Sequence, residues 1–198
     1  MQSSNLIRWA GLAAVLSGVS SVIGDLLSLV VDLESAESAA TTPYMLVFLL
    51  YLLGTVLLLL GLVGLYSSQS EPAGFLGLLG FLVAFLGTAL VSGALWFELF
   101  ITPSLAVEAP ELAEAELGLA GFAISFLLVV VGWVLFGVAT LRARVYPRLA
   151  AALLIVGAVA SLVPVPLSGV VLSVAVAWLG LMLFTGRGMP SEQPSRVS

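Results

Sequence analysis

The 198-residue chain contains no cysteine, no histidine and no lysine. Without cysteine it forms no disulfide and no thiolate, and it also lacks the histidine and cysteine ligands of zinc and haem sites. The absence of lysine excludes a retinal-type Schiff base and a phosphate-binding loop of the Walker type. We therefore expect no cofactor and no bound metal.

The same absences argue against an enzyme. Serine side chains here have neither histidine nor lysine to activate them, so a serine hydrolase is not expected. The chain has no basic surface of the kind that binds nucleic acid. A membrane enzyme acting on lipid is the least favoured function, because only two carboxyl groups and a few tyrosines remain as acid–base groups. We predict a non-enzymatic protein.

Apolar side chains are what the sequence has in abundance, since 61% of its residues are hydrophobic and 9% are charged. A soluble domain is about half apolar and about a quarter charged. A water-soluble fold of this size has too little interior to hide so much apolar surface. The sequence therefore predicts an integral membrane protein whose main partner is the lipid bilayer. The apolar runs are long and unbroken, which favours helices over the alternating strands of a membrane barrel.

Six apolar segments approach the length of about 20 residues that a helix needs to cross a bilayer. The predicted fold is all-α, a polytopic transmembrane bundle of about six helices that forms one domain over residues 1–185. The predicted spans are residues 6–31, 44–66, 73–101, 117–141, 149–163 and 167–184. Residues 186–198 are polar and contain several serines and prolines, which predicts a disordered cytoplasmic tail.

The charges are distributed unevenly around these six segments. With six spans, both termini, the second–third turn and the fourth–fifth loop share one side. That side carries every arginine, namely Arg8, Arg142, Arg144, Arg148, Arg187 and Arg196. The other side carries seven acids, namely Asp32, Glu34, Glu37, Glu108, Glu111, Glu114 and Glu116. Because short cytoplasmic loops are rich in arginine, we predict that both termini are cytoplasmic.

Three segments carry small residues at steps of three or four, and therefore along one helical face each. The three stripes are Ala13, Ser17, Ser21, Gly24 and Ser28; Gly80, Ala84, Thr88 and Ser92; and Gly169, Ser173, Ala177 and Gly180. Small residues let helices approach closely in lipid. Two interpretations stay open. The favoured one is tight packing within a single bundle, and the other is a homo-oligomer face on the third span.

Two acids, Asp25 and Glu98, lie inside predicted spans. An ionisable side chain that faces lipid costs about 2.5 kcal/mol or more, so such a residue is a functional hypothesis by default. One interpretation is an outward-opening pocket that holds a cation or a basic or amphiphilic ligand, or relays a proton. Its predicted lining is Asp25, Glu98, Ser21, Ser28, Trp96 and Tyr44. The favoured alternative is that both acids, in the outer third of the membrane, reach the aqueous boundary directly.

The three arginines Arg142, Arg144 and Arg148 surround Tyr146 and Pro147 in the predicted fourth–fifth loop. One interpretation is that they bind anionic lipid headgroups, at about 1 kcal/mol per arginine near the surface. The favoured interpretation is that they only set the topology and extend to the membrane surface.

A basic turn between two apolar helices also carries a family resemblance. It runs from Phe136-Gly137 through Arg142, Arg144 and Pro147-Arg148 to Gly157. The membrane region as a whole resembles the small six-helix bacterial membrane proteins grouped as domains of unknown function, which have a similar turn near the C-terminal end. The resemblance implies a six-helix bundle in a bacterial plasma membrane. It implies no activity and no particular site residues.

Overall fold

The structure is a computed structural model that describes residues 2–109, 119–163 and 167–186. Most of these residues are helical, and no strand occurs among them, which confirms the predicted all-α bundle. The predicted tail lies outside the described residues except for Gly186, as do the acids Glu111, Glu114 and Glu116.

Six apolar helices of the described residues form the bundle. Its helices are α1 (Gln2–Leu27), α3 (Thr42–Ser67), α4 (Ser70–Phe100), α7 (Leu119–Ala143), α8 (Arg148–Ala160) and α9 (Val170–Phe184). Two short helices, α2 (Ala36–Ala39) and α5 (Thr102–Glu108), lie between the predicted spans, in the acidic connections.

The described residues include four segments that are long and apolar enough to cross a membrane. These are Asn5–Leu27, Thr42–Ser67, Ser70–Glu108 and Ala120–Ala143. The chain is therefore a membrane protein. The last two helices are shorter, with 13 residues in α8 and 15 in α9. At 1.5 Å per residue they are about 20 and 22 Å long, against a hydrocarbon core of about 30 Å.

Turns shorten these two helices relative to the predicted spans. The chain leaves α8 through a turn in which the N–H groups of Leu162 and Val163 donate to the carbonyls three residues earlier. It enters α9 through Leu167, whose φ of 67° lies in the left-handed region. Such a residue does not continue a right-handed helix. The apolar pattern therefore extends about one turn beyond each helix.

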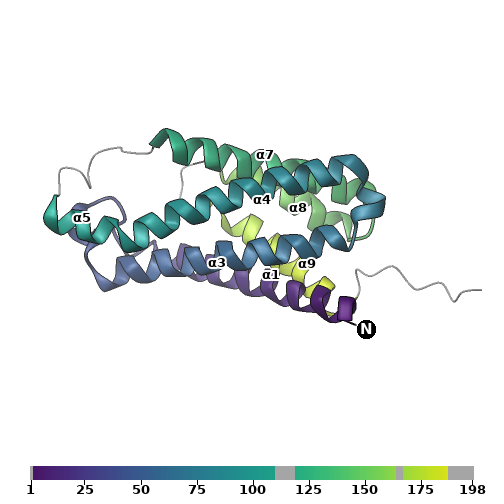
Figure 1. Ribbon diagram of the computed structural model, residues 1–198, viewed down its shortest axis with the longest axis horizontal. Helices are drawn as coiled ribbons and strands as arrows, with labels where there is room; N and C mark the ends of the chain where they lie inside the picture. Colours follow the sequence, from purple (N-terminus) through teal and green to yellow (C-terminus); the bar gives the residue numbers. More distant parts are fainter. Residues whose placement is uncertain (1, 110–118, 164–166, 187–198) are drawn as a thin grey trace, which may run out of the picture.

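The six bundle helices form a closed ring of neighbours. Helix α1 packs between α3 and α9, α4 packs between α3 and α7, and α8 packs between α7 and α9. Figure 1 shows the N-terminus, the α3–α4 turn and the α7–α8 connection at one end of the elongated bundle, which we call the arginine end. The opposite, acidic end contains α5 and the connection between α1 and α3.

The core is centred on two aromatic side chains of α7. Trp133 and Phe136 are fully buried and meet edge to face, with ring centroids 5.8 Å apart. Leucines of α3, α8 and α9 complete this core, namely Leu62, Leu65, Leu154, Leu179 and Leu183. Trp133 is therefore a packing residue, whereas Trp9 at the arginine end is 67% exposed and suits the membrane interface.

The small residues of α4 pack against α7. A methyl group added at Gly80 would lie 2.5 Å from the backbone nitrogen of Phe136, so only glycine fits there. A methyl group at Gly132 would meet the backbone of Ala84. The third-span stripe therefore faces α7 inside the chain, as the packing interpretation expects.

The other two stripes also make contacts within the chain, Ser21 of the first with Gly54 of α3, and Gly180 of the last with Ala14, which lies beside the first stripe. Ala14 of α1 is fully buried between two glycines, Gly61 of α3 and Gly180 of α9. A methyl group added at either glycine would lie 2.7 Å from the Ala14 Cβ. Close backbone approach of this kind is how helices associate in lipid. A homo-oligomer built on the stripes stays a prediction.

We expect Gly132→Ala to destabilise the bundle by about 1–3 kcal/mol, because the added methyl group overpacks the α4–α7 contact. The matched control is Gly93→Ala in α4, where an added methyl group meets nothing within 4 Å. That control should be neutral or stabilising by up to about 1 kcal/mol, because alanine favours helix. Thermal unfolding in detergent measures both. Equal effects of the two substitutions would contradict the close α4–α7 packing.

Candidate functional site: two tyrosine–carboxylate pairs

Three aromatic side chains follow one face of α3 near the acidic end. Tyr44, Phe48 and Tyr51 are spaced by four and three residues, which places them along one side of the helix. The ring centroids of Tyr44 and Phe48 are 4.5 Å apart, and those of Phe48 and Tyr51 are 6.4 Å apart. The row therefore presents two phenol groups separated by two helical turns.

The Tyr51 phenol binds Asp25 of α1. The Tyr51 hydroxyl donates a hydrogen bond of 2.9 Å to Oδ1 of Asp25. Gly24 makes room for the ring, because a methyl group there would lie 2.9 Å from Tyr51. The Ser28 hydroxyl donates to the backbone carbonyl of Asp25 at 2.8 Å, so it does not bind the carboxylate.

The second oxygen of Asp25 faces the start of α9. Oδ2 is buried and has no hydrogen-bond partner among the described residues. A methyl group added at Gly169, which directly precedes α9, would lie 3.6 Å from it. A helix N-terminus carries a partial positive charge and favours a nearby carboxylate. Asp25 thus lies where α1, α3 and the start of α9 meet.

The Tyr44 phenol binds Glu98 of α4. The Tyr44 hydroxyl donates to Oε2 of Glu98 at 2.8 Å, and the Thr102 hydroxyl donates to the same oxygen at 2.9 Å. Thr102 is the first residue of α5, one turn beyond Glu98. This carboxylate therefore joins α4 to α3 and supports the bend into α5.

The structure places the predicted pocket residues in separate surroundings. Tyr44 and Glu98 are paired, whereas Asp25 binds a different tyrosine. Ser21 packs against Gly54 of α3, with its hydroxyl 2.7 Å from where a methyl group at that glycine would lie. Trp96 is 52% exposed and packs on Phe100 at a centroid distance of 5.3 Å.

The predicted pocket lining left out two hydrogen-bond donors, Tyr51 and Thr102. The available signal for Tyr51 was its spacing of seven residues from Tyr44, which puts both phenols on one face of α3. For Thr102 it was the four-residue spacing from Glu98, which lets side chains meet on one helical face.

The three arginines of the α7–α8 connection are exposed around a buried tyrosine. The Tyr146 hydroxyl lies 2.6 Å from the hydroxyl of Ser68, in the α3–α4 turn. Burial raises the pKa of the Tyr146 phenol to about 12, and the hydrogen bond with Ser68 opposes part of that rise. Beside it, the Gln69 amide donates to the Thr140 hydroxyl at 2.9 Å. This buried polar cluster fixes the connection, while Arg142, Arg144 and Arg148 stay available to headgroups or solvent.

Comparison with known proteins adds no relative to this picture. No protein-family model, no curated protein and no solved structure matches the chain. Within the ranges that the structure describes, no three acidic side chains gather as a metal site would require. The chemistry of the candidate site therefore rests on two carboxylates, each bound by one tyrosine.

The two pairs should stabilise the bundle independently. We expect the double-mutant cycles Asp25→Asn with Tyr51→Phe and Glu98→Gln with Tyr44→Phe to give coupling energies near 0.6 kcal/mol each, and at most about 1.7, as for hydrogen bonds between membrane helices. The measurement is unfolding in detergent. The mixed cycle of Asp25→Asn with Tyr44→Phe is the control and should show no coupling. Strong coupling in that mixed cycle would mean that the two carboxylates share one site.

Proposed function

We propose that this chain is a multi-pass protein of a bacterial plasma membrane, with six crossings, both termini in the cytosol and a structural or interaction role without catalysis. The grouping of exposed Arg8, Arg142, Arg144 and Arg148 at one end supports this orientation. The exposed acids Asp32, Glu34, Glu37 and Glu108 lie toward the other end.

The short helices α8 and α9 complete the six crossings in this proposal. Residues 149–163 and 167–184 supply 15 and 18 consecutive positions without a charged residue. The start of α9 lies beside Asp25, and its end lies beside Arg8. Seventeen residues of α1 separate these two positions, which is about 25 Å along the helix. That length approaches the thickness of the hydrocarbon core, about 30 Å.

One observation carries the structural role, namely that hydrogen bonds within the protein already engage both intramembrane carboxylates. Tyr51 holds Asp25 and Tyr44 holds Glu98, so the acids join α3 to α1 and α4. Each carboxylate thus has at least one oxygen that is hydrogen-bonded within the protein without a ligand. The pairs therefore support a scaffold more than an open binding pocket.

The proposed topology predicts which positions an impermeant thiol reagent labels. The natural chain has no cysteine, so each introduced residue is the only thiol. In intact cells we expect labelling of Glu34→Cys and Glu108→Cys, because both positions are exposed at the acidic end. Ser67→Cys and Arg144→Cys, at the arginine end, should react only after permeabilisation. Labelling of one position from each end in intact cells would contradict the proposal.

A second function, a small transporter or ligand-binding membrane protein, is favoured by one feature. Oδ2 of Asp25 is buried without a hydrogen-bond partner among the described residues. A carboxyl oxygen in that state is suited to hold a proton or a cation, because an unpartnered polar atom in a low-dielectric site is unfavourable.

Proton flux in proteoliposomes separates the two functions. If the structural role holds, the wild-type protein, Asp25→Asn and Glu98→Gln should all give the flux of protein-free vesicles. Wild-type flux that Asp25→Asn abolishes would instead establish the transport function. Thermal unfolding of each variant serves as the folding control.

A further inference from the structure

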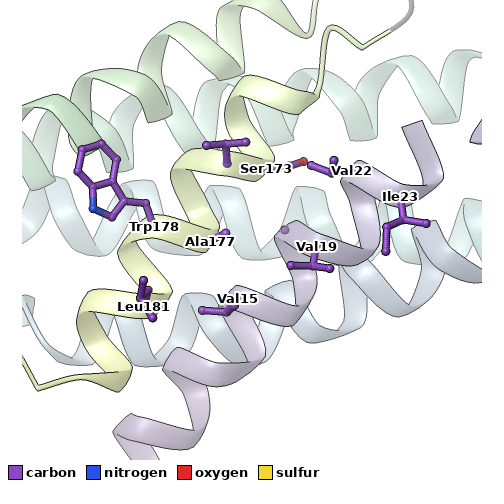
Figure 2. Close-up of a pocket in the computed structure, with 10 residues that line it drawn as sticks. Val15, Val19, Val22, Ile23, Ser173, Ala177, Trp178 and Leu181 are labelled. Atoms are coloured by element: carbon purple, nitrogen blue, oxygen red, sulfur yellow. The ribbon is translucent and has the colours of Figure 1, made fainter. Parts of the chain in front are cut away.

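An apolar groove runs along the outside of the seam between α1 and α9 (Figure 2). Its volume is about 430 Å³, within the range of about 300–1,000 Å³ that ligand pockets occupy. Val15 and Val19 line it from α1, and Val174, Trp178 and Leu181 line it from α9. Its walls are almost purely hydrocarbon, so its occupant must be apolar.

The packing of the two helices explains the groove. Gly18 brings α1 close to α9, because a methyl group there would meet Ser173 and Ala177. Close backbones leave a furrow beside the seam, and the small side chain of Ala177 does not fill it. Val19 and Val174 flank the furrow and are about half exposed, at 47% and 48%. In a membrane protein such exposed apolar walls face lipid.

A cation lies on the same seam, toward the arginine end. Arg8 is two turns before Val15 on α1, and its Nε donates to the carbonyl of Phe184 at 3.2 Å. The guanidinium carbon lies 5.5 Å from the centre of the Phe184 ring. The side chain is exposed, and no carboxylate of the described residues forms an ion pair with it. Its terminal N–H groups match the geometry of a phosphate.

We propose that this groove holds an acyl chain of an anionic phospholipid whose phosphate binds Arg8. Val15 is seven residues from Arg8, or about 10 Å along the helix. One leaflet of the hydrocarbon core is about 15 Å thick, half of about 30 Å. A chain that starts at the level of Arg8 therefore reaches the near end of the groove, at Val15, within its own leaflet, and at full extension it approaches Val19, about 17 Å along the helix. The inference goes beyond the proposed structural role and does not depend on it.

The test uses the full chain in mild detergent, incubated with phosphatidylglycerol or with phosphatidylcholine of identical acyl chains. Native mass spectrometry measures the retained lipid. We expect preferential retention of phosphatidylglycerol, which Arg8→Gln lowers about fivefold, since one arginine contributes about 1 kcal/mol near a membrane surface. Retention of phosphatidylcholine should not change in that variant. The matched control is Arg142→Gln, which removes an exposed arginine away from the groove and should lower phosphatidylglycerol retention less than Arg8→Gln does.

Two further variants test the groove itself. Val174→Phe and Val19→Phe fill it from opposite walls, and each should lower retention of both lipids. Val156→Phe on α8 is the control, because that side chain is also exposed, at 57%. If Val174→Phe unfolds, Val19→Phe carries the test from the other wall.

Three results would overturn the proposal. The first is equal loss of phosphatidylglycerol in Arg8→Gln and Arg142→Gln. The second is full lipid retention in folded groove-filling variants. The third is a change in the number of chains per complex when the groove is filled, which would show that a second copy of this chain occupies it.

Discussion

Every backbone polar group that a chain carries into hydrocarbon needs a partner within the protein, because lipid offers none. Helices satisfy the backbone in this way, and several polar side chains also find partners within the protein. The hydroxyls of Ser92, Ser125 and Thr140 donate to carbonyls four residues earlier on their own helices. Within the described part of the chain, Asp25 has no local side-chain donor and Glu98 has only Thr102, so both carboxylates also take hydrogen bonds from tyrosines of α3. Because an unpaired carboxylate is unfavourable in hydrocarbon, these hydrogen bonds fix α1, α3 and α4 relative to one another.

Close backbone approach holds these helices together, because lipid already satisfies their apolar side chains. Ala14 between Gly61 and Gly180 illustrates the principle, since α1 contacts two neighbours through a single methyl group. Because such residues have small side chains, the space beside the contact between α1 and α9 stays unfilled. The packing that joins α1 to α9 therefore also creates the apolar groove on the lipid side.

The sequence predicted the helical bundle well because hydrocarbon thickness sets the length of apolar runs and polar turns interrupt them. It overestimated the lengths of α8 and α9. Apolar residues also fill the turns at the ends of these helices, and composition does not distinguish a turn from a helix. It identified Asp25, Glu98 and Tyr44 but not Tyr51, because the partner of a carboxylate depends on which helices are neighbours. Arg8 was assigned only a topological role for the same reason: its place on the α1–α9 seam follows from long-range packing.

Helix α1 also complements the dipole of α9 with a charge at each end. Asp25 lies beside the N-terminus of α9, where the dipole is positive, and Arg8 binds a carbonyl at the C-terminus, where it is negative. Each such placement contributes about 0.3–1 kcal/mol, and more where water is partly excluded. A shift of α1 by one turn would misplace both charges together, and would also move Gly18 away from Ala177. Charge and close packing therefore select the same antiparallel register, which explains how a helix as short as α9 is held at a defined depth.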